Sequence, residues 1–182
     1  MAETLFAFLA LAIASLFAMS QMRASVEAER EVASIELEVL ANAVGSETMQ
    51  FLSTLSFDAR TADGTVNPQN LDVSGLTRSS EFGDGLDCTI PGTCEDLDDF
   101  NNMRPDTLFF EVDIDDEGES IGFNFAVTAL VSYIDETTGV ETADRTWTKE
   151  VTLFIDQAVA SSETKYLLRP VEIKRQFSPQ WR

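Results

Sequence analysis

The sequence predicts an α+β protein in which a long N-terminal α-helix packs on a C-terminal four-stranded antiparallel β-sheet. An uncharged apolar run at the start of the chain forms the first half of the helix. It continues into an amphipathic stretch that contains no proline. After residue 105, apolar residues alternate with polar ones over several segments, a pattern typical of half-buried strands. Together these observations indicate a helical rod joined to one compact domain.

The chain divides into four parts by composition. Residues 1–23 are an apolar helix for a filament core or a membrane, and residues 24–55 extend it as an amphipathic helix. Residues 56–105 are a loop segment that connects helix and sheet and contains a disulfide. Residues 106–182 form the globular antiparallel sheet domain. The part after the helix is long enough to bury a core of modest size.

The apolar run extends from Thr4 to Met22 and lies between the charged residues Glu3 and Arg23. As a helix that rises about 1.5 Å per residue, it is long enough to cross a hydrocarbon core of about 30 Å. No basic residue precedes the run, whereas signal peptides and signal anchors carry basic residues on that side. We therefore expect a processed chain from which a basic leader has been removed.

The helix is expected to continue from Ala24 to about Leu55 as an amphipathic rod. Apolar residues recur there at spacings of three or four, which places them on one side of a helix. This stripe comprises Ala33, Leu37, Leu40, Val44, Thr48, Phe51 and Leu55. A continuous helix over residues 3–55 is about 80 Å long. No small domain buries such a rod along its length, so the first half needs a membrane or further copies of the chain.

Glycines and prolines interrupt residues 56–105, which also contain the two cysteines of the chain, Cys88 and Cys94. Pro91 and Gly92 between them favour a tight turn that brings the two thiols together. A disulfide is therefore expected in a domain outside the cytoplasm. Two cysteines alone make a poor metal site, and the chain has no histidine to complete one.

Four strands are expected in the last part of the chain, over residues 107–114, 121–134, 145–156 and 166–177. Pro170 lacks an N–H, so the fourth strand is either an edge strand or interrupted by a bulge. The apolar residues expected to share a face within each strand are Leu108, Phe110, Val112, Ile114, Phe123, Phe125, Val127, Ala129, Val131, Tyr133, Trp147, Val151, Leu153, Ile155, Leu167, Val171, Ile173 and Phe177. This face should pack on the amphipathic half of the helix.

The charge of the chain limits the classes of function. The formal net charge is −20 and histidine is absent. So large an acidic excess argues against nucleic acid as a partner, because its phosphates would be repelled. A Ser–His triad is excluded within this chain. No nucleophile–base constellation, phosphate-binding glycine loop or metal-ligand spacing appears, so we expect that the protein is not an enzyme.

The basic residues are concentrated at the end of the chain. Five of them lie in residues 164–182, where Glu172 is the only acid; they are Lys165, Arg169, Lys174, Arg175 and Arg182. One interpretation is that they balance acidic loops of the same chain. The other is that they meet an acidic surface on the next subunit of a polymer.

Two acidic clusters resemble calcium ligands in part, and no other cofactor is expected. Asp113, Asp115 and Glu117 match the opening of a calcium loop, but the twelfth position is Asn124 and not a bidentate glutamate. The second cluster, next to the cysteines, comprises Glu95, Asp96, Asp98 and Asp99. For both, a solvated loop is preferred over a calcium site.

The order of these parts resembles the type IV pilins and pseudopilins. The local match lies in residues 1–23, which begin with Met1, an early Glu3 and the apolar run. The amphipathic extension, the connecting loop and the antiparallel sheet follow the same pilin-like plan. The spacing from Met1 to Glu3 and the lack of a helix-kinking proline depart from the family pattern.

This resemblance implies that the chain is a structural subunit of an extracellular filament on the cell surface, reached through the cytoplasmic membrane. Its partners would then be further copies of itself, the pilus assembly machinery and a prepilin peptidase. Glu3 would neutralise the N-terminus of a neighbouring subunit. The residues implied in assembly are Met1, Glu3, Leu5, Phe6, Phe8, Leu9, Ile13, Leu16 and Phe17. The filament would serve adhesion, motility or another surface interaction.

A second interpretation uses the same helix differently. The helix would tether a monomeric extracytoplasmic domain to the membrane, or the chain would be a minor pseudopilin of a secretion system. In either case the acidic loops would be the place for a ligand such as calcium.

Overall fold

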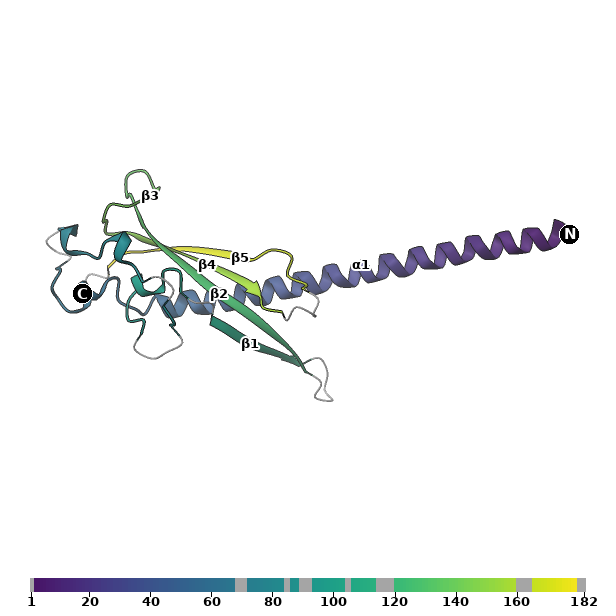
Figure 1. Cartoon of the computed structure of the whole chain (residues 1–182), viewed down its shortest axis with the longest axis horizontal. Helices are drawn as coiled ribbons and strands as arrows, with labels where there is room; N and C mark the ends of the chain where they lie inside the picture. The colour runs from purple at the N-terminus through teal and green to yellow at the C-terminus, as the bar shows by residue number, and fades with distance from the viewer. Residues whose placement is uncertain are drawn as a thin grey trace.

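One long helix and one antiparallel sheet make up most of the protein. The computed structural model describes residues 2–67, 72–83, 86–88, 93–103, 106–113, 120–159 and 165–179. Helix α1, Ala2–Leu52, has 51 residues and is therefore about 75 Å long. Figure 1 shows that the sheet lies against the C-terminal half of α1, while the N-terminal half projects away from the rest of the molecule. The predicted α+β fold class is confirmed.

The sheet has the strand order β1-β2-β4-β5, and every neighbouring pair is antiparallel. A fifth strand of two residues, β3, pairs with β2 outside this order. The bounds are Asp106–Asp113 for β1, Ser120–Ile134 for β2, Glu141–Thr142 for β3, Lys149–Gln157 for β4 and Val171–Phe177 for β5. The four longer strands correspond to the four predicted ones.

Two strands begin later than predicted. Before β4, the hydroxyl of Thr146 lies 2.8 Å from the carbonyl of Ile134 and 2.9 Å from that of Thr148, and its one hydrogen is shared between them. A side chain therefore ends the ladder at this point. Strand β5 begins directly after Pro170 and is an edge of the described sheet, in agreement with the missing N–H of proline.

The core lies between α1 and the inner face of β2 and β4. Successive inner positions on the two strands are buried, as the alternation predicts: Phe125, Val127, Ala129, Val131 and Tyr133 on β2, and Val151, Leu153 and Ile155 on β4. Helix α1 contributes Leu37, Ala41, Val44, Met49 and Leu52. The predicted stripe is wrong at its end, where Phe51 is 53 % exposed and Leu52 is fully buried.

Helix and sheet approach each other most closely at Gly45. A Cβ atom at this position would lie 2.5 Å from Cδ1 of Ile173 and 2.7 Å from Cδ1 of Ile155. Both distances are far below van der Waals contact between carbon atoms. Glycine is therefore the residue that allows α1 to lie so near β4 and β5.

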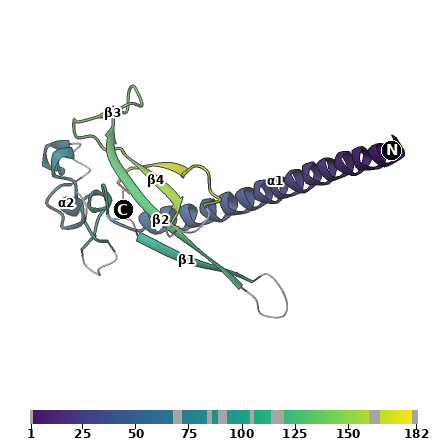
Figure 2. The same cartoon turned by 45° about the vertical axis from the view of Figure 1, so that its right-hand side comes forward.

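The connecting segment adds a layer of core beyond the end of α1. It contains the short helix α2, Ala59–Ala62, and 3₁₀ turns at Val73–Gly75, Ser79–Glu81 and Asp98–Phe100. Its buried apolar residues are Phe57, Val66, Leu76, Phe82, Leu97, Phe100 and Met103. In Figure 2 this segment gathers around the end of α1 that is remote from the N-terminus. The predicted disulfide between Cys88 and Cys94 is present.

Hydrogen bonds fix this segment to β2. The Asn102 N–H donates to the Ala129 carbonyl at 2.9 Å, and the Val131 N–H donates to Oδ1 of Asn101 at 3.0 Å. Tyr133, also on β2, donates its hydroxyl to the Thr77 carbonyl at 2.7 Å. The segment is therefore part of the folded domain and holds its side chains in defined positions.

Candidate functional site

The first half of α1 exposes large apolar side chains to solvent. Phe6, Leu9, Leu11, Ile13, Leu16, Phe17, Met19 and Met22 are all more than half exposed. Among the described side chains of α1, none before Ala33 is even partly buried, and Leu37 is the first that is fully buried. An exposed apolar surface of this extent marks a protein or membrane interface.

The implied assembly residues lie on this rod wherever the structure describes them. Phe6, Leu9, Ile13, Leu16 and Phe17 are exposed. Met1 and the side chains of Glu3, Leu5 and Phe8 lie outside the described residues. By length and composition the helix suffices to cross a membrane, and its position at the N-terminus also suits a signal sequence.

The first calcium candidate lies outside the described part of the chain. Asp115 and Glu117 are not described, and neither is the side chain of Asp113. The preferred prediction of a solvated turn, and the calcium site that is its alternative, are therefore both untested at this hairpin.

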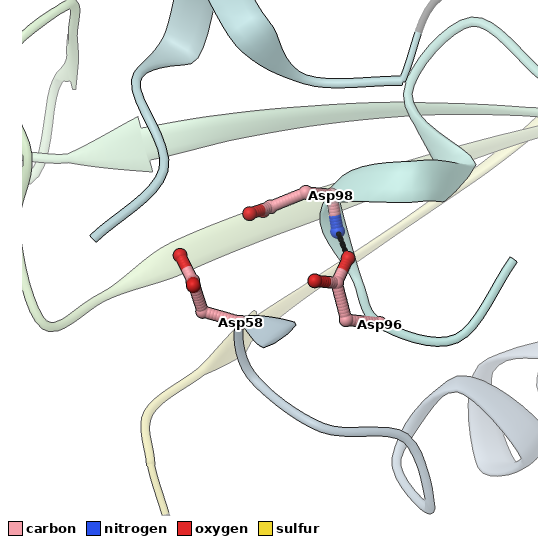
Figure 3. A group of neighbouring side chains, drawn as sticks. All are labelled: Asp58, Asp96 and Asp98. Atoms are coloured by element: carbon pink, nitrogen blue, oxygen red, sulfur yellow. Dashed lines mark hydrogen bonds between the residues drawn. The ribbon is translucent and has the colours of Figure 1, made fainter. Parts of the chain in front are cut away.

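The second acidic cluster is not a solvated loop, so that prediction is wrong. Asp96 is 4 % exposed and Asp98 is 3 % exposed, while Glu95 remains on the surface. The chain turns inward here because Asp96 accepts hydrogen bonds from the N–H groups of Asp98 and Asp99 through one oxygen. The two buried side chains meet Asp58, which follows α1 (Figure 3).

These three carboxylates surround a buried lysine at the start of β4. Oxygens of Asp58, Asp96 and Asp98 lie within 4.8 Å of one another. Lys149 is fully buried, and its Nζ lies 2.5 Å from Oδ1 of Asp98 and 3.4 Å from Oδ2 of Asp58. The same Nζ donates a hydrogen bond of 2.6 Å to the carbonyl of Phe57. We call Lys149 and the three aspartates the buried cluster.

Three aromatic rings enclose the lysine nitrogen. The centroid of Phe57 lies 4.2 Å from Nζ, that of Tyr133 5.2 Å and that of Phe82 5.3 Å. Ring faces at these distances attract a cation. They also keep water away from the nitrogen and from the nearby carboxyl groups.

Backbone hydrogen bonds help to give the three carboxyl groups different pKa values. Asp58 accepts from the N–H groups of Arg60 at 3.0 Å and Thr77 at 2.8 Å. Burial opposes ionisation of Asp58, but the charge of Lys149 and these two N–H groups outweigh it and lower the pKa of this carboxyl. Asp58 is therefore held as a carboxylate.

Asp98 has the opposite environment. Burial is the main cause that raises the pKa of Asp98 to about 7, although the charge of Lys149 lowers it in part. Burial, followed by the charge of Asp99, also raises the pKa of Asp96. Within the described residues, neither oxygen of Asp98 accepts a hydrogen bond. Asp98 is thus the carboxyl group least committed to the ionised form.

The buried cluster does not fit a metal ion in this arrangement. Three carboxylates are a suitable ligand set for a hard cation, but Nζ of Lys149 already lies against Asp98 and Asp58. A divalent cation there would have to displace a buried ammonium group.

Sequence reasoning missed Lys149 and Asp58. A signal for Lys149 was available, because it falls between Trp147 and Val151 in the series of alternate residues that face the core. Nothing in the local pattern marks Asp58, which meets the lysine only through the tertiary fold.

Comparison of the chain with protein-family models, with curated proteins and with solved structures finds no match. The exposed half of α1 and the buried cluster are the features of the described residues that bear on function.

Proposed function

We propose that this chain is a structural subunit of an extracellular filament similar to a type IV pilus, and that it polymerises through the first half of α1. The observation that carries the proposal is the rod of exposed apolar side chains that the described part of the chain leaves uncovered. Each apolar Å² withdrawn from water contributes about 25 cal/mol, so burial of this surface between subunits is a large driving force for assembly.

The distribution of residues on the rod supports a helical bundle. Leu9, Ile13 and Phe17 lie on one side, while Leu11 lies on another, and a helix that is apolar all round is normally buried on all sides. Ala10, Ala14 and Ala18 recur every four residues, and small residues at this spacing allow two helices to approach closely. Helices of neighbouring subunits would cover one another in this way.

The packed half of the molecule suits the outside of such a filament. The strongly acidic composition favours a solvated surface, and the disulfide suits an oxidising compartment. Before assembly the rod would reside in the cytoplasmic membrane. A second candidate function, a membrane-tethered monomeric domain, is favoured by the length of α1, which suffices for a membrane span.

The test is electron microscopy of filaments sheared from the native cells, with mass spectrometry of the same fraction. We expect filaments that contain this chain. Glu3→Ala should abolish or strongly reduce them, because an unpaired N-terminus in an apolar core is costly. Glu27→Ala, which changes an exposed glutamate beyond the apolar run, is the matched control and should leave assembly intact. A chain that stays in the membrane fraction as a monomer would instead support the tethered domain.

A further inference from the structure

The contact between Lys149 and Asp98 is not an ordinary ion pair. Nζ lies 2.5 Å from Oδ1, whereas charge-assisted N–H···O bonds are usually about 2.7–2.9 Å long. Yet this contact does not have the geometry of an ordinary hydrogen bond, although the two groups are close enough for a strong electrostatic interaction. The amine nitrogen therefore lies close enough to the carboxyl group for the two to react.

We propose that Lys149 and Asp98 form a covalent isopeptide bond between Nζ and Cγ, and that Asp58 relays the proton. Nothing in this inference depends on filament assembly, because all three residues belong to one folded chain. The bond would join the connecting segment to the first residue of β4.

The reaction needs no co-reactant. The ammonium group of Lys149 gives one proton to the Asp58 carboxylate, whose Oδ2 lies 3.4 Å away. The neutral amine then attacks Cγ of Asp98, and Asp58 returns the proton to the departing oxygen. A second proton passes from the attacking nitrogen through Asp58 to the same oxygen. The Nζ–Cγ bond forms, the Cγ–O bond breaks and one water molecule leaves, so an ammonium and a carboxylate become an amide and water.

The environments of the carboxyl groups assign these roles. An attacked carboxyl group must lose an oxygen, and this is easier for a group that is not stabilised as a carboxylate. Asp58 and Asp96 each accept hydrogen bonds from backbone N–H groups. Asp98 receives no such hydrogen bond within the described residues and contacts only the lysine nitrogen. This difference points to Asp98 as the electrophile and to Asp58 as the relay.

Burial makes the condensation favourable. Two charged groups that are buried away from water carry a desolvation penalty of several kcal/mol per ion. Formation of a neutral amide removes both charges. Groups held in reactive geometry have effective concentrations of about 10⁵–10⁸ M, which offsets the usual preference for hydrolysis. The rings of Phe57, Phe82 and Tyr133 keep water from the bond once it has formed.

The experiment is intact-mass spectrometry of the purified full chain in detergent after reduction of the disulfide. We expect a mass lower than that of the sequence by one water molecule. After denaturation and digestion with trypsin, cleavage after Lys149 should be absent. A branched peptide should join the segment of Asp98 to that of Lys149, with fragment ions that locate the bond.

Three variants separate the roles. Lys149→Arg keeps the charge but lacks the amine, so this variant should have the full mass of its own sequence. Asp98→Asn should still give the branched peptide, now with loss of ammonia and not water. Asp58→Asn should lower the rate of bond formation at least about tenfold, since a positioned proton relay contributes about 10²–10⁴-fold.

The measurement on the unaltered chain does not depend on how well any variant folds. The full sequence mass together with tryptic cleavage after Lys149 would overturn the proposal. A branched peptide that joins Lys149 to Asp58 would overturn the assignment of the electrophile. A failed filament assay would leave the cross-link result unaffected.

Discussion

Lys149 occupies a position where the strand alternation places an apolar residue. Its stem packs within the core, and its nitrogen finds the carbonyl of Phe57 and two carboxyl groups. Removal of one partner from a buried ion pair usually destabilises a protein by about 3–5 kcal/mol. A single substitution in the buried cluster should therefore lower the stability of the whole domain, because all four of its residues are buried.

The first prediction concerns Lys149→Met, which removes the cation and the amine and leaves Asp98 buried. Burial raises the pKa of Asp98 from an ordinary value of 3.8 to about 7 even beside the charge of Lys149, which lowers it. The folded variant lacks this charge and therefore keeps a proton that the unfolded chain releases. Its free energy of unfolding should therefore decrease as pH rises through this window. Between about pH 5 and pH 8 we expect a loss of at least about 2 kcal/mol, measured by chemical denaturation.

The control is the double variant Lys149→Met/Asp98→Asn, which has no carboxyl group at this position. Its unfolding free energy should lack this part of the pH dependence, so the difference between the two variants isolates Asp98. Identical pH profiles for the two variants would contradict the buried, protonated state of Asp98.

A second prediction concerns Gln157 at the end of β4. Its Oε1 accepts hydrogen bonds from the N–H groups of Tyr166 at 2.8 Å and Leu167 at 3.0 Å. The residue is only 8 % exposed. Gln157→Leu should reduce the free energy of unfolding by about 2 kcal/mol, because two backbone donors lose their acceptor. Gln157→Glu retains an acceptor oxygen and should be closer to the parent protein. Equal stability of the two variants in urea denaturation would refute this role.

At the scale of elements, hydrophobic periodicity is sufficient to predict the helix and the sheet. The spacing of Leu37 and Val44 predicted the buried side of α1, and the alternation from Phe125 to Tyr133 predicted the inner face of β2. Strand starts were less predictable, because Thr146 ends a ladder by a side-chain hydrogen bond. This contact forms only when β2 is in place beside β4, because Thr146 reaches the carbonyl of Ile134 on β2.

The buried cluster could not be predicted from local patterns. The acidic residues beside Cys94 suggested a solvated loop, since most aspartates are exposed. Asp96 and Asp98 are buried because the connecting segment folds over the start of β4 and meets Lys149. Only the three-dimensional path of residues 56–105 brings these groups together.

The third prediction tests the close approach of α1 to the sheet. Gly45→Leu should reduce the free energy of unfolding by about 1–3 kcal/mol, because the new side chain must displace Ile155 and Ile173. Ala43→Leu introduces the same side chain on the exposed side of α1 and should change stability by no more than about 0.5 kcal/mol. Denaturation of both variants in the same detergent gives the comparison, and equal effects would contradict the close packing at Gly45.

The whole molecule consists of a packed half and an uncovered half. The residues of α1 that enter the core begin near Ala33, and the sheet contacts the helix through β4 and β5. In the uncovered half, every side chain that the structure describes is exposed. Folding of the domain and association of the rod should therefore be separable properties.

The fourth prediction follows from this separation. A chain that lacks residues 1–28 keeps every buried residue of α1 and should be soluble without detergent. Its thermal midpoint should lie within about 4 °C of that of the full chain, which corresponds to a change of less than about 1 kcal/mol. Circular dichroism and light scattering measure both properties, and an unfolded truncated chain would show that the rod is needed for folding.

The order of elements along the chain also determines how the domain responds to pulling. In the proposed filament, tension would enter each copy through α1, which is packed on β4 and on β5 near the other end of the chain. Strands β1, β2 and β3 lie in the sequence between Asp98 and Lys149. With these two residues joined covalently, stretching the chain from its ends would peel α1 and β5 away while the three strands between stay unextended. The subunit would then lengthen under load by a limited amount and refold around an intact part of its sheet.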